Sequence, residues 1–73
     1  DHIIMKVGNG PASRQPVIEI ANLFRAKVVN VAESRLMLEL TGEPEKIDSF
    51  IGLLQPYGVK EIVRTGISAL ERD

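Results

Sequence analysis

The sequence predicts a small α+β domain whose elements follow the order β-α-β-β-α-β. Two segments repeat apolar residues at helical spacing, and four further segments are rich in β-branched residues or alternate between apolar and polar residues. The length of 73 residues leaves room for one modest core, since a chain this short buries only about 60–65% of its unfolded surface. We therefore expect residues 1–73 to form a single domain.

Two amphipathic helices are predicted from apolar residues spaced i, i+3, i+4, i+7. The first follows Ser13 at an N-cap position, has a proline in its first turn and ends near Ala26. The second opens with Gly42-Glu43-Pro44 and is stopped by Gln55-Pro56-Tyr57-Gly58. Their apolar faces consist of Val17, Ile20, Ala21 and Phe24 in the first helix and of Ile47, Phe50, Ile51 and Leu54 in the second.

Four strands are predicted at residues 2–7, 27–32, 35–41 and 59–69. The first ends at Gly8-Asn9-Gly10-Pro11, a sequence that breaks regular structure. The third alternates cleanly between apolar and polar residues, and we expect it to form a hairpin with the second that turns near Glu33-Ser34. A bend or bulge is expected in the last strand at Gly66.

This order of elements is a βαβ unit that occurs twice, roughly over residues 1–33 and 34–69. Right-handed crossovers place both helices on one face of a four-stranded antiparallel sheet. The expected architecture is ferredoxin-like, which is also the architecture of ACT-type regulatory domains. Many unrelated functions share this fold, so the function has to be sought in particular residues.

Composition and charge exclude several classes of function. The 9 Lys and Arg residues and the 10 Asp and Glu residues nearly balance, so no strong field attracts nucleic-acid phosphates or anionic lipids. The lack of cysteine excludes disulfides and thiolate chemistry and fits a reducing, cytoplasmic location. The apolar runs are far shorter than the roughly 20 residues of a membrane-spanning helix. We expect a soluble protein with no nucleic-acid and no membrane partner.

Few residues are suited to catalysis or to holding a cofactor. The single histidine, His2, lies at the start of the chain, where a general base is poorly supported. Glu43, Glu45 and Asp48 surround the start of the second helix, and the helix dipole explains them better than a metal does. Gly8-Asn9-Gly10 lacks the further glycine of a dinucleotide fingerprint, so we expect a tight turn there. We predict no catalytic residue, no metal site and no cofactor.

One face of the predicted sheet is the strongest candidate for an interaction surface. The helix-covered face takes Ile3, Met5, Val7, Val29, Val31, Leu36, Leu38 and Leu40. Four apolar residues then point the other way, namely Ile4, Val28, Met37 and Ile62, with Val63 as the alternative to Ile62. Together these residues would form a continuous apolar patch of roughly a few hundred Å², the size at which a partner surface is expected. Scattered surface aliphatic residues are the alternative interpretation.

Three cationic residues flank the predicted elements. Arg25 and Lys27 bracket the end of the first helix, where their charges complement the negative pole of the helix dipole. Arg64 lies late in the last strand. It is either a solvated strand side chain or an interface anchor, and the sequence leaves both readings open.

Several short segments occur in the order seen in one known family. They are Ile4-Met5-Lys6-Val7; Phe24-Arg25-Ala26-Lys27-Val28-Val29 followed by Val31; Leu38-Glu39-Leu40-Thr41-Gly42 with Lys46-Ile47-Asp48; and Leu54 through Gly58-Val59-Lys60-Glu61-Ile62-Val63-Arg64-Thr65-Gly66. Together they resemble the C-terminal domain of the small regulatory subunit of acetolactate synthase (acetohydroxyacid synthase). Each motif alone is ordinary, but the ordered set is specific. The glycine-rich first loop and the tail at 68–73 depart from the family pattern.

The resemblance implies regulation rather than catalysis. In that family the small subunit carries an N-terminal ACT domain that binds the inhibitor valine at a dimer interface, and the large subunit holds thiamine diphosphate, FAD and magnesium. This chain would form a homodimer or higher oligomer and relay valine inhibition to the large catalytic subunit in branched-chain amino acid biosynthesis. Because the sequence begins at Asp1 rather than at methionine, we expect an excised domain or a processed fragment.

Two other classes of function stay open. A free-standing ACT-like sensor would bind a small amino acid at a dimer interface between the first helix and a neighbouring strand, and titration with valine, leucine and isoleucine would reveal it. A small ferredoxin-like enzyme is the third possibility. The lack of converging titratable groups argues against an enzyme.

Overall fold

The computed structural model describes residues 1–32 and 34–66. The β-α-β-β-α-β order predicted from the sequence is confirmed, and two short 3-10 turns precede α1 and follow α2. The elements are β1 (His2–Val7), α1 (Arg14–Phe24), β2 (Lys27–Val31), β3 (Leu36–Thr41), α2 (Pro44–Leu54) and β4 (Val59–Thr65). The part of the last predicted strand at 67–69, like the predicted turn residue Glu33, lies outside the described residues.

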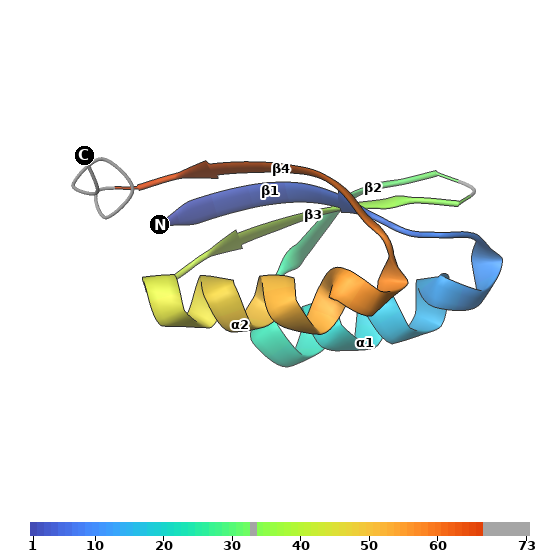
Figure 1. Ribbon diagram of the computed structural model, residues 1–73, viewed down its shortest axis with the longest axis horizontal. Helices are drawn as coiled ribbons and strands as arrows, with labels where there is room; N and C mark the ends of the chain where they lie inside the picture. Colours follow the sequence, from blue (N-terminus) through green and yellow to red (C-terminus); the bar gives the residue numbers. More distant parts are fainter. Residues whose placement is uncertain (33, 67–73) are drawn as a thin grey trace.

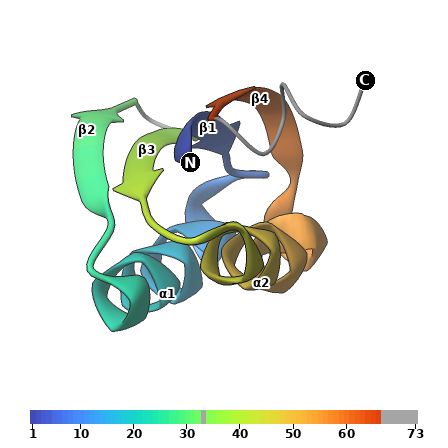
Figure 2. The same cartoon turned by 90° about the vertical axis from the view of Figure 1, so that its left-hand side faces the viewer.

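The four strands form one antiparallel sheet in the order β2-β3-β1-β4. β1 is central, and β2 and β4 are the edge strands. Both helices lie on the same side of the sheet, as Figure 1 and Figure 2 show from two directions. The predicted ferredoxin-like α+β architecture is therefore confirmed. The face of the sheet away from the helices is called the open face below.

The hydrophobic core fills the space between the helices and the sheet. Every second residue of β1 and of β3 is buried there, which agrees with the alternation read from the sequence. The rings of Phe24 and Phe50 lie 5.2 Å apart and are tilted by 57°, a favourable arrangement for aromatic pairs. The buried apolar residues are Ile3, Met5, Val7, Val17, Ala21, Leu36, Leu38, Leu40, Ile47, Phe50 and Leu54.

The edge strand β2 contains a bulge. Its residue Val28 is opposite Leu38 and Asn30 is opposite Met37, so Val29 is one extra residue in the pairing with β3. Val29 was expected under the helices, but it is 49% exposed. A bulge on an edge strand also hinders the addition of a further strand at that edge.

The other edge strand, β4, is irregular near its beginning. Lys6 is opposite Glu61 whereas Val7 is opposite Val59, so Lys60 is the extra residue. The bend or bulge predicted at Gly66 stays a prediction, because β4 ends at Thr65 and residues 67–69 lie outside the described residues.

Helix α1 ends in a turn with a left-handed residue. Arg25 has φ 59° and ψ 36°. Its N–H donates to the carbonyl of Asn22 at 3.1 Å, and the N–H of Ala26 donates to the carbonyl of Ala21 at 2.8 Å. These two bonds define the Schellman motif, in which glycine is the usual residue at the left-handed position. Arginine at this position adds backbone strain, because its Cβ crowds the following carbonyl.

Candidate interaction surface

Three apolar side chains lie on the open face of the sheet: Ile4 of β1, Met37 of β3 and Val63 of β4. Ile4 is opposite Val63, and Met37 is opposite Lys6, in the register of the sheet. Together with Lys6 and Glu61 they border a shallow hollow of about 50 Å³. The predicted positions of Ile4 and Met37 on this face are confirmed, while their role in an interface stays a prediction.

Val28 and Ile62 do not lie on the open face, contrary to the prediction, whereas Val63, the alternative to Ile62, does. Val28 is opposite Leu38 and Ile62 is opposite Met5, and both partners are buried under the helices. Directly opposed residues of an antiparallel pair share a face of the sheet. The bulges at Val29 and Lys60 cause the error, because each extra residue reverses the alternation. Both side chains are partly exposed because they lie on edge strands.

Two pairs of polar side chains separate the apolar residues of the open face. The Nε2 atom of His2 lies 2.6 Å from Oε2 of Glu39, and Nζ of Lys6 lies 3.4 Å from Oε1 of Glu61. His2, at the start of the chain, is paired in the sheet with Thr41 and Thr65. Such exposed pairs contribute about 0–1 kcal/mol each. The open face is therefore a mixed surface and not the continuous apolar patch expected from the sequence.

Arg64 lies opposite Ile3, on the side of the sheet that the helices cover, and binds other parts of the chain. Its Nε and Nη2 donate to Oδ2 of Asp1 at 3.1 and 3.0 Å. Its Nη1 donates to Oδ1 of Asp48 at 2.6 Å, and Nη2 also reaches the carbonyl oxygen of Pro44 at 3.4 Å. Arg64 thus links the start of β1, the end of β4 and the start of α2. These contacts are structural, and the predicted interface role of Arg64 stays a prediction.

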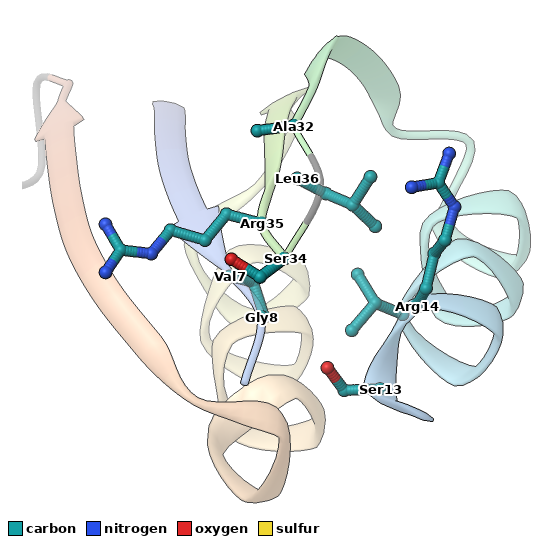
Figure 3. A pocket seen from close by; sticks show the side chains of 9 residues that line it. Val7, Gly8, Ser13, Arg14, Ala32, Ser34, Arg35 and Leu36 are labelled. Atoms are coloured by element: carbon teal, nitrogen blue, oxygen red, sulfur yellow. The ribbon is translucent and has the colours of Figure 1, made fainter. Parts of the chain in front are cut away.

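A small hollow lies between the start of α1 and the β2–β3 hairpin. The turn of this hairpin is closed by a hydrogen bond from the N–H of Ala32 to the carbonyl of Arg35 at 2.8 Å. The volume of the hollow is about 10 Å³, which is room for one water molecule. The guanidinium groups of Arg14 and Arg35 point away from each other in Figure 3. The hollow is therefore too small to be a ligand site.

The neighbouring Gly8–Gly10 loop uses its polar groups internally. The N–H of Gly8 donates to the carbonyl of Gly58 at 2.9 Å, and the N–H of Asn9 donates to Oγ of Ser13 at 2.9 Å. The Ser13 hydroxyl donates to the carbonyl of Gly10 at 2.9 Å, so it closes the loop and does not cap α1. The loop is a tight turn, as predicted, and these two N–H groups are not available to a phosphate.

A broad depression, called the cationic hollow below, lies at the end of the domain where α1 ends and α2 begins. Its volume is about 360 Å³. Figure 2 looks onto this end of the molecule, where the last turn of α1, the start of β2, the end of β3 and the first turn of α2 meet. The hollow is lined by Arg25, Lys27, Glu39, Leu40, Thr41 and Lys46. Sequence reasoning assigned Arg25 and Lys27 to the helix dipole and did not connect them with Lys46.

The surface features define a class of protein. Within residues 1–32 and 34–66, no group of three or more His, Asp or Glu side chains is placed to hold a metal ion. The helices of this part of the chain are too short or too polar to cross a membrane. What the described part of the chain presents is a ferredoxin-like α+β domain with two candidate contact surfaces, a mixed sheet face and a charged depression.

Comparison with known proteins gives the family. The family model described as the small subunit of acetolactate synthase matches residues 1–73. The chain is 42% identical over 69 residues to the acetolactate synthase small subunit of Mycolicibacterium smegmatis, covering 94% of this chain and 41% of that protein. It is 44% identical over 69 residues to the acetolactate synthase small subunit of Bacillus subtilis, covering 94% of this chain and 40% of that protein.

A solved structure agrees with these matches. The crystal structure of the acetolactate synthase small subunit from Thermotoga maritima superposes with a TM-score of 0.82 at 32% sequence identity, over 89% of this chain and 40% of that chain. The chain belongs to the family of acetolactate synthase small subunits, and the resemblance noted in the sequence is confirmed. The chain spans about two fifths of the length of these relatives.

Proposed function

We propose that this chain is a regulatory and assembly domain of acetolactate synthase. It supports dimerisation of the small subunit and relays valine feedback inhibition to the large catalytic subunit in branched-chain amino acid biosynthesis, in the cytoplasm. The observation that carries the proposal is the family match over residues 1–73. The chain spans about two fifths of its relatives, and its motifs resemble the C-terminal domain of the small subunit. We therefore assign valine recognition to an ACT domain elsewhere in the small subunit.

The surface of the domain supports a non-catalytic role. Its charged and apolar groups are spread over an open sheet face and a broad depression, whereas catalytic groups converge on one substrate position. The chemistry of the complex accordingly belongs to the large subunit, and we propose no cofactor for this chain.

Deleting this domain from the full-length small subunit is expected to blunt valine inhibition of the reconstituted enzyme. Coupling between two sites is typically worth about 1–3 kcal/mol, so the valine concentration for half inhibition should rise about 5- to 150-fold. Inhibition curves of the large subunit, with intact or truncated small subunit, measure this shift. An unchanged valine response would replace the regulatory role with a purely structural one.

The same domain alone is expected not to bind valine, leucine or isoleucine measurably in calorimetric titration. The hollow beside Lys6 and Glu61 is shallow, and these two side chains pair with each other at 3.4 Å. The cationic hollow is broad and open, so neither offers the enclosed apolar cleft that recognition of an amino acid requires. Binding of one of these amino acids by the isolated chain would favour the free-standing sensor.

We expect the chain to self-associate, with the open face contributing the apolar residues Ile4, Met37 and Val63. Replacing Val63, which is 54% exposed, by lysine should weaken the dimer. The matched control is the replacement of Val29 by lysine. Val29 is 49% exposed and lies on the other edge strand, so this replacement should leave the dimer unchanged. Analytical ultracentrifugation measures the distribution of species. A strict monomer at about 100 μM would contradict dimerisation through this domain.

A further inference from the structure

Three cationic side chains from different parts of the fold border the cationic hollow. Arg25 follows α1, Lys27 begins β2 and Lys46 lies in the first turn of α2. All three residues are exposed. The protein as a whole has a formal net charge of -1, so this concentration of positive charge is a local feature and not a general property of its surface.

Three cations outnumber the acidic groups that line the hollow. Glu39 is the carboxylate that lines it in the described part of the chain; it is opposite Lys27 in the sheet, and its Oε2 lies 2.6 Å from Nε2 of His2. The ion pairs among residues 1–32 and 34–66 involve Glu39, Glu61, Asp1 and Asp48, but they do not involve Arg25, Lys27 or Lys46. The hollow therefore presents a positive field to an incoming anion.

Arg25 gives a second, independent indication. It occupies the left-handed position of a Schellman motif, where glycine is the usual residue and carries no strain. What arginine supplies there and glycine does not is a guanidinium group at the rim of the hollow. Backbone strain of this kind concentrates at functional sites, so the strain at Arg25 points to a use for its side chain.

The third cation, Lys46, packs its side chain against the backbone at Gly42. A Cβ atom on Gly42 would lie only 3.0 Å from Cδ of Lys46, so the lysine stem lies directly against this glycine. Gly42 comes immediately after Thr41, which lines the hollow. The aliphatic part of Lys46 is thus placed along the segment between β3 and α2, beside the depression that its charge borders.

The chemistry of the hollow favours carboxylates on a polypeptide over a small phosphate. Its three cations come from separate places around a broad depression, whereas a compact phosphate site brings several donors, backbone N–H groups among them, to one position. Separate cations around a broad, open depression suit several carboxylates spaced along a chain. We propose that the cationic hollow binds an acidic segment, rich in Asp and Glu, of the large catalytic subunit. The identity of this partner rests on the proposed function.

Association of the full-length small subunit with the large subunit tests the site. Surface plasmon resonance at about 50 and 300 mM salt measures the association rate. The double variant Lys27→Glu/Lys46→Glu, called the hollow variant below, should associate at least about tenfold more slowly than the wild type at low salt. Its association rate should also depend less on the salt concentration than that of the wild type. The matched control is Arg14→Glu/Lys60→Glu, which makes the same change of charge at exposed positions outside the hollow. This control should associate within about threefold of the wild type, because its charges lie away from the contact.

The variant Arg25→Gly separates binding from folding. Removing the left-handed strain should raise the Tm of the chain by about 4 °C, measured by circular dichroism. The same variant should weaken association with the large subunit at least about threefold, because it loses one of the three charges. A variant that is both more stable and equally tight in binding would overturn the use of Arg25 at this surface.

Two soluble probes separate the possible ligands. A labelled hexaglutamate peptide should bind the wild-type chain and the control, and should lose binding to the hollow variant. Stronger competition by pyrophosphate than by hexaglutamate would make the hollow a phosphate site and overturn the proposal. Equal loss of large-subunit binding in the hollow variant and the control would also overturn it, since net charge alone would explain the effect. If no small subunit binds the large subunit but hexaglutamate still requires the hollow, the proposed function fails and the acidic-peptide site stands.

Discussion

Replacing Phe50 by alanine is expected to lower the free energy of unfolding by about 3–5 kcal/mol. Phe50 is fully buried in the middle of the core, and its ring also contacts Phe24. The substitution removes buried apolar surface and leaves a cavity that the surrounding strands can fill only in part. Small domains are stable by only about 5–15 kcal/mol, so this loss is a large part of the total.

Urea titration followed by circular dichroism measures the loss at Phe50. The matched control is Leu53→Ala on the same helix, where the side chain is 48% exposed and the expected loss is about 0.5 kcal/mol. Phe24→Ala should cost less than Phe50→Ala, because Phe24 is only partly buried. If Phe50→Ala does not fold, Phe50→Leu should show a smaller loss in the same direction. A loss below about 1 kcal/mol for Phe50→Ala would show that this ring does not hold the core together.

Replacing Arg64 by alanine is expected to cost about 2–3 kcal/mol of unfolding free energy. The Asp1 side chain is only 3% exposed and accepts two hydrogen bonds from this guanidinium. The substitution leaves a buried carboxylate without those two bonds. The loss of unfolding free energy is limited, because Arg64 itself is 26% exposed and water can reach the space it leaves.

Two further variants identify which contact of Arg64 matters. Asp48→Ala removes a partner whose side chain is 66% exposed, so its cost should stay below about 1 kcal/mol. Arg64→Lys keeps the charge but loses the planar fork, so its stability should lie between those of the wild type and Arg64→Ala. Equal stability of Arg64→Ala and the wild type would show that the Asp1 contact contributes nothing. Any effect of Arg64→Ala on valine regulation has to be corrected for this loss of stability.

The central strands and the helices were predictable because local patterns dominate them. β1 and β3 are buried on one face along their whole length, so their alternation could be read directly. The facing of side chains on the edge strands could not be predicted in this way. One extra residue at Val29 and one at Lys60 change which face of the sheet the neighbouring side chains lie on. A run of valines in β2 looks the same with or without a bulge. The positions of Val28 and Ile62 were wrong for this reason.

The cationic hollow was missed because its residues are distant in the sequence. Arg25 and Lys27 are close together, but Lys46 reaches them only through the packing of α2 beside the end of β3. The contact of Arg64 with Asp1 spans nearly the whole chain in the same way. The prediction that the first helix ends near Ala26 also hid this site, because the helix ends at Phe24 and Arg25 occupies the left-handed position where glycine or asparagine is usual.

The network around Arg64 also determines how the domain responds to force. The start of β1 and the end of β4 lie side by side, with His2 opposite Thr65, as Figure 1 shows at one end of the sheet. Tension applied to the two ends of the described chain therefore pulls these strands apart like a zipper, and the backbone hydrogen bonds break one pair after another. If the two ends of the chain lay at opposite ends of the sheet, tension would act along the strands, and all the hydrogen bonds between them would have to break at the same time. The Arg64–Asp1 contact lies at the point where this opening begins, so it is among the first bonds to resist tension on the two ends of the described chain.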